Sequence, residues 1–141
     1  MAYAIQPITT TAALTMTRGR HGNTVVVLDS STGRTLTLPA SSGSGDVYTV
    51  YVKTTVSSGS HVIQVANSTD VMNGGVAIST DIAGITMLAA ASSDTITMNG
   101  STTGGLAGSQ VTLTDVVAGF WMVSGFLVST GVEATPWPAA V

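Results

Sequence analysis

The chain has 141 residues, of which only 8% are charged, and its formal net charge is −3. Its length suits one domain with a real core, while its charged fraction is far below the ~25% of an ordinary soluble domain. Its 23 Thr and 16 Ser supply surface polarity without charge. So few charges provide little repulsion between copies, and we expect part of the surface to be buried in an oligomer or a larger assembly.

The composition also excludes several classes of site and partner. Without cysteine the chain has no disulfide, thiolate nucleophile or Cys-based metal centre. The most apolar stretch, residues 116–128, falls short of the ~18 residues that a membrane span requires, so no membrane crossing is predicted. Four scattered basic residues cannot form a stripe that holds a phosphate backbone, and nucleic acid is excluded as a predicted partner.

The first segment, residues 1–12, is predicted to be an extended arm. Pro7 interrupts it, and Ile5 and Ile8 give it apolar contacts to make on another surface. It lacks the basic start and apolar core of a secretory signal.

Residues 13–133 are predicted to form an all-β domain. Short β-prone windows follow one another, and no long window places apolar residues at helical spacing. About ten short strands predict a compact antiparallel sandwich or a small barrel. The predicted strands are 13–17, 24–28, 35–38, 47–54, 61–66, 76–79, 85–88, 94–98, 111–113 and 120–128.

The segment 29–39 carries the clearest local pattern. A polar turn, Asp29 to Gly33, leads into a strictly alternating Thr-Leu-Thr-Leu strand that Pro39 ends. This order predicts a turn, a half-buried strand and a stop.

Turn signals separate the other strands. Asn73-Gly74 and Asn99-Gly100 are each predicted to close a hairpin, because Asn-Gly tolerates positive φ at both positions. The Gly-rich stretch 101–109 is predicted to be a mobile surface loop. No internal repeat is strong enough to indicate a solenoid.

The last two features are aromatic. The strand 120–128 is apolar on both faces, which favours a central strand or one that contacts a neighbouring subunit. Residues 134–141 are predicted to be a Pro-rich arm, in which Trp137 lies between two prolines. That tryptophan either caps its own core or inserts into an adjacent subunit.

No constellation of residues predicts catalysis. His21 and His61 have no acidic partner at a telling spacing, and no G-x-S-x-G elbow occurs. The aspartates are scattered, so capping of turns is favoured over a cation site. We therefore predict no catalytic, cofactor-binding or metal-binding residue, and no enzymatic activity.

Five phrases carry a resemblance to a known group of proteins. They are Thr32–Ala40, Ser60–Ala66, Asp94–Gly100, Trp121–Gly125 and Thr130–Pro136. Together they resemble phrases of the small β-rich capsid decoration, or cement, proteins of tailed bacteriophages. These are scaffold phrases without a catalytic motif.

The resemblance implies a β-fold that assembles as a homotrimer or clamps adjacent hexamers. It would bind the major capsid protein on the outer surface of the phage head and hold the shell against internal DNA pressure. Similar strands occur in trimeric tail fibres, so a fibre module for host attachment is the alternative. The residues predicted to lie at the oligomer or capsid interface are Ile5, Pro7, Ile8, Trp121, Trp137 and Pro138.

Overall fold

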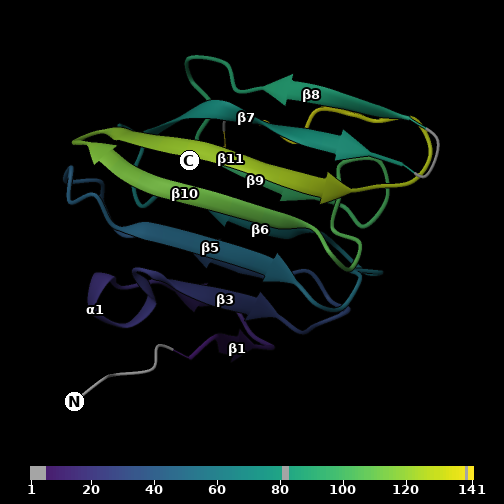
Figure 1. Ribbon diagram of the computed structural model, residues 1–141, viewed down its shortest axis with the longest axis horizontal. Helices are drawn as coiled ribbons and strands as arrows, with labels where there is room; N and C mark the ends of the chain where they lie inside the picture. The colour runs from purple at the N-terminus through teal and green to yellow at the C-terminus, as the bar shows by residue number, and fades with distance from the viewer. Residues whose placement is uncertain (1–5, 81–82, 139) are drawn as a thin grey trace.

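The structure is a computed structural model that describes residues 6–80, 83–138 and 140–141, and these fold into two packed β-sheets. Figure 1 shows the strands of the larger sheet side by side, from β8 to β1, with β6 and β9 behind them. The larger sheet contains, in spatial order, β1 (Ile8–Thr10), β3 (Thr24–Leu28), β5 (Val47–Val52), β10 (Gln110–Val117), β11 (Phe120–Val128), β7 (Val71–Ser79) and β8 (Gly84–Leu88). The smaller sheet contains β2 (Leu14–Thr15), β4 (Thr35–Thr37), β6 (His61–Gln64) and β9 (Thr95–Met98). One helical turn, α1 (Arg18–His21), precedes β3.

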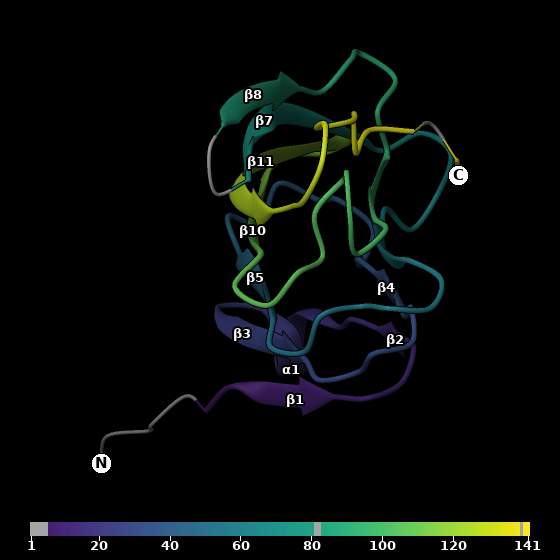
Figure 2. The same ribbon diagram turned by 90° about the vertical axis from the view of Figure 1, so that its right-hand side faces the viewer.

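The first half of the chain winds between the two sheets. Strands β1, β3 and β5 are parallel neighbours in the larger sheet, and β2, β4 and β6 are parallel neighbours in the smaller one. Each odd strand is followed by an even strand in the opposite layer, so the segment forms three coils of a short solenoid. Figure 2 shows β2 and β4 on one side of β3 and β5.

The sequence shows no internal repeat that would indicate this winding, and the coil lengths explain why. Ile8 pairs with Val26, a spacing of 26 − 8 = 18 residues, whereas Val26 pairs with Val50, a spacing of 50 − 26 = 24 residues. Repeats are recognised in a sequence by a fixed period. Coils of unequal length have none.

The predicted antiparallel arrangement is wrong, because both sheets are mixed. Strands β5, β10 and β11 are antiparallel neighbours, and so are the pairs β7–β8 and β6–β9, but β11 is parallel to β7. Alternating apolar and polar residues set which face of a strand is buried, not its direction. The all-β character itself is confirmed.

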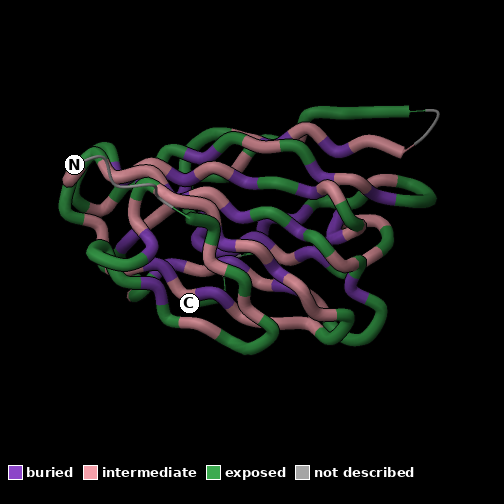
Figure 3. Tube along the Cα trace, turned by 60° about the horizontal axis from the view of Figure 1, so that its bottom comes forward, coloured by how far each residue is buried: buried purple, intermediate pink, exposed green. Residues whose placement is uncertain are grey.

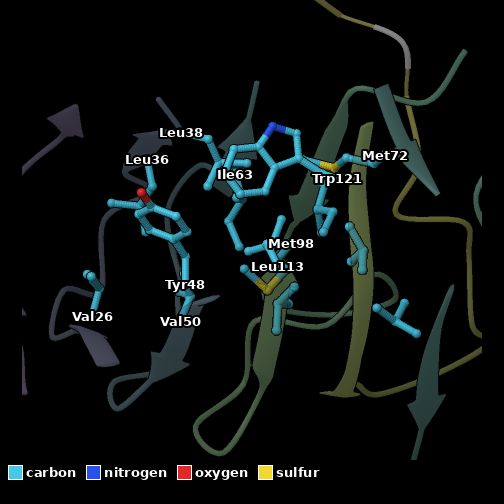
Figure 4. Packing of buried hydrophobic residues seen from close by; sticks show 14 of the residues in the cluster. Val26, Leu36, Leu38, Tyr48, Val50, Ile63, Met72, Met98, Leu113 and Trp121 are labelled. Atoms are coloured by element: carbon cyan, nitrogen blue, oxygen red, sulfur yellow. The ribbon is translucent and has the colours of Figure 1, made fainter. Parts of the chain in front are cut away.

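The core lies between the two layers. Along most strands buried residues alternate with intermediate or exposed ones, as Figure 3 shows by purple segments separated by pink and green ones. Leu36 and Leu38 are fully buried while Thr35 and Thr37 are half-buried, so the predicted half-buried strand is confirmed. In Figure 4, side chains of the larger sheet such as Tyr48 and Trp121 lie between the layers together with Leu36 and Ile63 of the smaller sheet.

Neither Asn-Gly pair closes a hairpin between paired strands. Asn73 and Gly74 lie inside β7, where a Cβ on Gly74 would stand only 2.0 Å from the Val123 carbonyl oxygen. Asn99 and Gly100 do follow β9, but the next strand along the chain, β10, belongs to the other sheet. Glycine is needed at these positions because two backbone segments lie too close together for a side chain. In the local sequence this requirement cannot be told apart from that of a hairpin turn.

Both predicted arms contribute to the folded unit. Part of the N-terminal segment forms β1, which pairs with β3. At the other end, Thr97 N–H donates to the carbonyl of Pro136, and the backbone amides of Ala140 and Val141 donate to the carboxylate of Asp94. The C-terminal segment therefore covers the edge of β9.

The stretch 101–109 is tied into the fold more closely than predicted. Ser109 is fully buried, and its hydroxyl accepts hydrogen bonds from the backbone amides of Gly105 and Val128. Ala107 N–H donates to the Thr55 hydroxyl. Glycine richness here allows close packing, with Gly104 and Gly105 both buried.

Candidate docking face

The outer face of the larger sheet is the most unusual surface of the molecule. It points toward the viewer in Figure 1, away from the smaller sheet. Among all described strands the only Asp, Glu, Lys or Arg is Asp115, which is buried. The outer face is therefore built from uncharged side chains alone. Those of the four central strands include Val47, Thr49, Tyr51, Gln110, Thr112, Thr114, Val117, Phe120, Met122, Ser124, Phe126, Val128, Val71, Asn73, Ala77 and Ser79.

Strand register arranges these side chains in rows across the sheet. One row runs from Tyr51 through Gln110 and Phe126 to Ala77. A second row, two residues along, contains Thr49, Thr112 and Ser124, and ends beside Leu88 of β8.

The third row contains Val47, Thr114, Met122 and Asn73. A central row of hydroxyls is thus flanked on both sides by rows that carry large apolar groups. The exposed fractions of Phe126 and Met122, 41% and 53%, are high for such side chains in the middle of a sheet.

The outer face of the smaller sheet is different. There the register sets Val62 between Thr35 and Thr97, and Thr37 beside Gln64. This face holds no aromatic or Met side chain among its outward residues, and its hydroxyl and amide groups are suited to water. The larger sheet is therefore the side on which an apolar partner gains contact area.

Two ion pairs lie near the ends of the strands on the β3–β5 side of the larger sheet. Lys53 Nζ lies 2.8 Å from Asp29 Oδ2, and Arg18 pairs with Asp46. The hydrogen bond from Lys53 is the main cause that lowers the pKa of the Asp29 carboxyl. Both pairs use residues outside the strands, so the strand rows themselves remain uncharged.

Asp115 fixes the loop 41–44 beside the end of β10. Its carboxylate accepts hydrogen bonds from the hydroxyls of Ser41 and Ser44 and from the backbone amides of Ser42 and Gly43, at 2.8 to 3.1 Å. Burial alone would raise the pKa of this carboxyl, but the converging donors outweigh it and hold the pKa far below its usual range. An ionised carboxylate whose oxygens accept this many hydrogen bonds has a structural role and holds the loop in place.

A hollow of about 370 Å³ lies at one end of the outer face. Phe126 and Val128 of β11 line it together with Leu106 from the 101–109 loop. The remaining lining residues, Ser79, Thr80, Ser129 and Thr130, supply hydroxyls. It is large enough for one apolar side chain or one sugar ring, and it contains no titratable group among the described residues.

The two histidines accept hydrogen bonds from backbone amides. His21 Nδ1 accepts a hydrogen bond from Thr17 N–H at 2.9 Å, and His61 Nδ1 accepts one from Arg34 N–H at 3.1 Å. Both rings are buried, and burial is the largest cause that lowers the pKa of each. Within the described residues, no group of three or more His, Asp or Glu side chains is arranged to hold a metal ion.

The predicted interface residues fall in three different environments. Pro7 and Pro138 are exposed, and Ile8 is half-buried in β1. Trp121 is fully buried and packs edge-on against Tyr48, with ring centroids 5.4 Å apart. Ile5 lies outside the described residues.

Trp137 is 9% exposed and its indole N–H donates to the Met87 carbonyl at 3.0 Å, so it caps the core of its own chain. Of the strand 120–128, the sequence singled out Trp121, but the exposed apolar groups are its neighbours Phe120 and Met122. The strand is apolar on both faces, so the sequence alone could not show which of its alternate residues point inward.

No family model, no curated protein and no solved structure matches this chain. In the described part of the chain, no helix has the length and apolar character needed to cross a membrane.

Proposed function

We propose that this chain is a virion structural protein: a capsid decoration, or cement, protein that binds the outer surface of a bacteriophage head and stabilises the shell. The observation that carries the proposal is the uncharged outer face of the larger sheet, with its exposed Phe120, Met122 and Phe126. A surface of this kind is costly for a free monomer and favourable for a subunit that is docked in an assembly.

The five phrases that resemble decoration proteins supply the particular assembly. In this proposal the major capsid protein is the partner, the chain acts without enzymatic activity or cofactor, and its site is the outside of the head. The homotrimer implied by the same resemblance is the proposed form on the shell.

The mechanism is differential binding. A subunit that binds the assembled shell and not the free capsid protein stabilises the shell by mass action. The two-layer sandwich supports this role, because a rigid body transmits a load between its contacts without deforming. The exposed Pro7 and Pro138 are the predicted interface residues that remain available to contact the shell.

Immunogold electron microscopy of intact virions, with antibody raised against this chain, tests the proposal. Label distributed over the heads is the expected result. Particles without label would refute a place in the virion.

A module of a tail or head fibre is the second candidate, and the hollow between Phe126 and Leu106 favours it. An exposed aromatic ring with hydroxyls around it is a common platform for a sugar. Label at the fibre tips, together with glycan-array binding that Phe126→Ala removes, would favour this candidate over the first.

A further inference from the structure

We propose that the outer face of the larger sheet packs against the same face of a second copy of this chain, as a two-fold symmetric pair. This inference rests on the proposed function, since both take the face to be buried in an assembly, but it replaces the homotrimer that the resemblance implies by a two-fold pair. The surface left for the shell is then the remainder of the molecule.

The charge of the face favours a like partner. Its strands carry no exposed charged side chain, so two identical faces meet without the like-charge repulsion that normally opposes self-association. The same absence of charge provides no sign by which an oppositely charged partner would be selected.

The area of the face is sufficient for a stable pair. Six strands, β3 to β8 in spatial order, span about 29 Å at the usual strand spacing, and their mean length of seven residues spans about 23 Å, which together give roughly 670 Å². Standard interfaces bury about 800 Å² on each partner. Moreover, two copies of one sheet have the same twist, which is the condition for aligned face-to-face packing of sheets.

The pattern of the rows specifies the direction of the two-fold axis. If the axis crosses the strands along the central row, Thr112 and Ser124 each face their own counterparts in the partner. Phe126 then faces Met122 of the partner subunit, and Tyr51 faces Val47 of the partner subunit, because the flanking rows exchange. The large apolar groups meet apolar groups, the central hydroxyls meet hydroxyls, and Gln110 faces Thr114 of the partner subunit, while Ala77 faces Asn73 of the partner subunit.

An axis that runs along the strands between β10 and β11 is less favourable. It would set Phe126 against Gln110 of the partner subunit and Met122 against Thr114 of the partner subunit. Those contacts cover polar groups with apolar ones and leave hydrogen bonds unmade. The arrangement with the axis across the strands is therefore the one we assign.

Crosslinking through a single introduced cysteine tests the pair directly, since the natural chain has no cysteine. In the proposed arrangement Ser124→Cys lies near the axis, and the two facing sheets are about 10 Å apart. A short bis-maleimide should therefore link two full-length Ser124→Cys chains into a covalent dimer. Val132→Cys is the matched control, because Val132 is 83% exposed but lies outside the face.

The expected yield of dimer is at least about ten-fold higher for Ser124→Cys than for Val132→Cys, since the pair raises the effective concentration of facing thiols. Equal yields would overturn the proposal. Light scattering of the wild-type chain, which has no cysteine, provides a second readout. The expected mass is twice the 14.1 kDa of one chain. A monomer at all concentrations, or a trimer, would also overturn the two-fold pair.

A charged variant separates this inference from the proposed function. Met122→Glu should weaken pairing by about 100-fold or more, because it buries two uncompensated charges, whereas Val132→Glu should leave pairing unchanged. Circular dichroism checks that both variants fold. A wild-type chain that stays monomeric but co-sediments with phage heads would overturn the pair and leave the proposed function standing. A chain that pairs through this face but does not bind heads would support the pair and count against the cement role.

Discussion

At the scale of single residues, several glycines that the sequence pattern assigns to turns are required because two backbone segments lie close together. Gly33 is an example, because a Cβ there would lie 2.2 Å from the Ser60 carbonyl oxygen. Gly33 belongs to one of the phrases that carry the resemblance, and it lets the segments that lead into β4 and β6 lie close together.

Two glycines with nearly the same backbone angle allow steric clash to be separated from backbone strain. Gly100 has φ +77° and a Cβ there would stand 1.9 Å from the Val56 carbonyl oxygen, whereas Gly45 has φ +78° and open space around it. We expect Gly45→Ala to cost about 1 kcal/mol of unfolding free energy, from left-handed strain alone. Gly100→Ala should cost at least about 2 kcal/mol more, because the carbonyl must move. Urea unfolding of both variants measures the difference, and equal costs would contradict the clash.

Asp115 is the residue whose charge matters most to the fold. Asp115→Asn replaces one acceptor oxygen by an amide group that faces the donors of the 41–44 loop. We expect a loss of about 2 to 4 kcal/mol of unfolding free energy at pH 7. Because the folded pKa is lowered, the stabilisation is present above the unfolded value near 3.9 and is lost as pH falls below it toward the folded pKa.

Urea unfolding at pH 7 and pH 3 measures this dependence. The difference in free energy of unfolding between wild type and Asp115→Asn should be smaller at pH 3 than at pH 7. A difference that is the same at both values would show that the carboxylate charge is not what holds the loop.

At the scale of elements, the C-terminal segment is the part whose assignment changes most. The sequence predicts residues 134–141 to be an arm for docking, and the structure packs Pro136 and Trp137 against the core of the same chain. Deletion of the segment would therefore uncover β9 and the core, and a loss of capsid binding by that deletion would not by itself identify a docking arm.

Point variants distinguish the two roles. Trp137→Ala should lower the free energy of unfolding by about 3 kcal/mol, because it removes a buried ring and its hydrogen bond to Met87. Pro138→Ala, at an exposed position, should change stability by less than about 0.5 kcal/mol. Thermal unfolding measures both. If Pro138→Ala nevertheless reduces co-sedimentation with heads, the exposed proline contacts the shell.

At the scale of the whole molecule, we expect the two buried histidines to make the fold sensitive to mild acid. Burial lowers the pKa of each below its ordinary value of 6.5. The unfolded chain then binds more protons than the folded one below about pH 6.5, so stability falls as the pH decreases from there toward the folded pKa values.

His61→Asn tests this pH dependence. The amide oxygen of Asn can accept the hydrogen bond that Arg34 N–H now gives to the ring, but it does not titrate. We expect the variant to be less stable at pH 7.5, because ring volume is lost, and to lose less further stability than wild type between pH 6.5 and pH 5. Urea unfolding at several pH values across that range measures the loss. If the free energy of unfolding falls equally with pH in the variant and in wild type, His61 does not cause the sensitivity to acid.

The sequence by itself determined the local properties of this protein: its all-β class, most of its strand positions, the buried parity of Leu36 and Leu38 and the scarcity of charge. These follow from propensity and alternation, which act over a few residues. Only the tertiary structure decided the direction of the strands, the winding of β1 to β6 between two sheets and the inward packing of Trp121 and Trp137. It also decided that Phe126 and Met122 point outward and Trp121 inward, because β11 is apolar at both parities and the packing of the whole core selects which of them is buried.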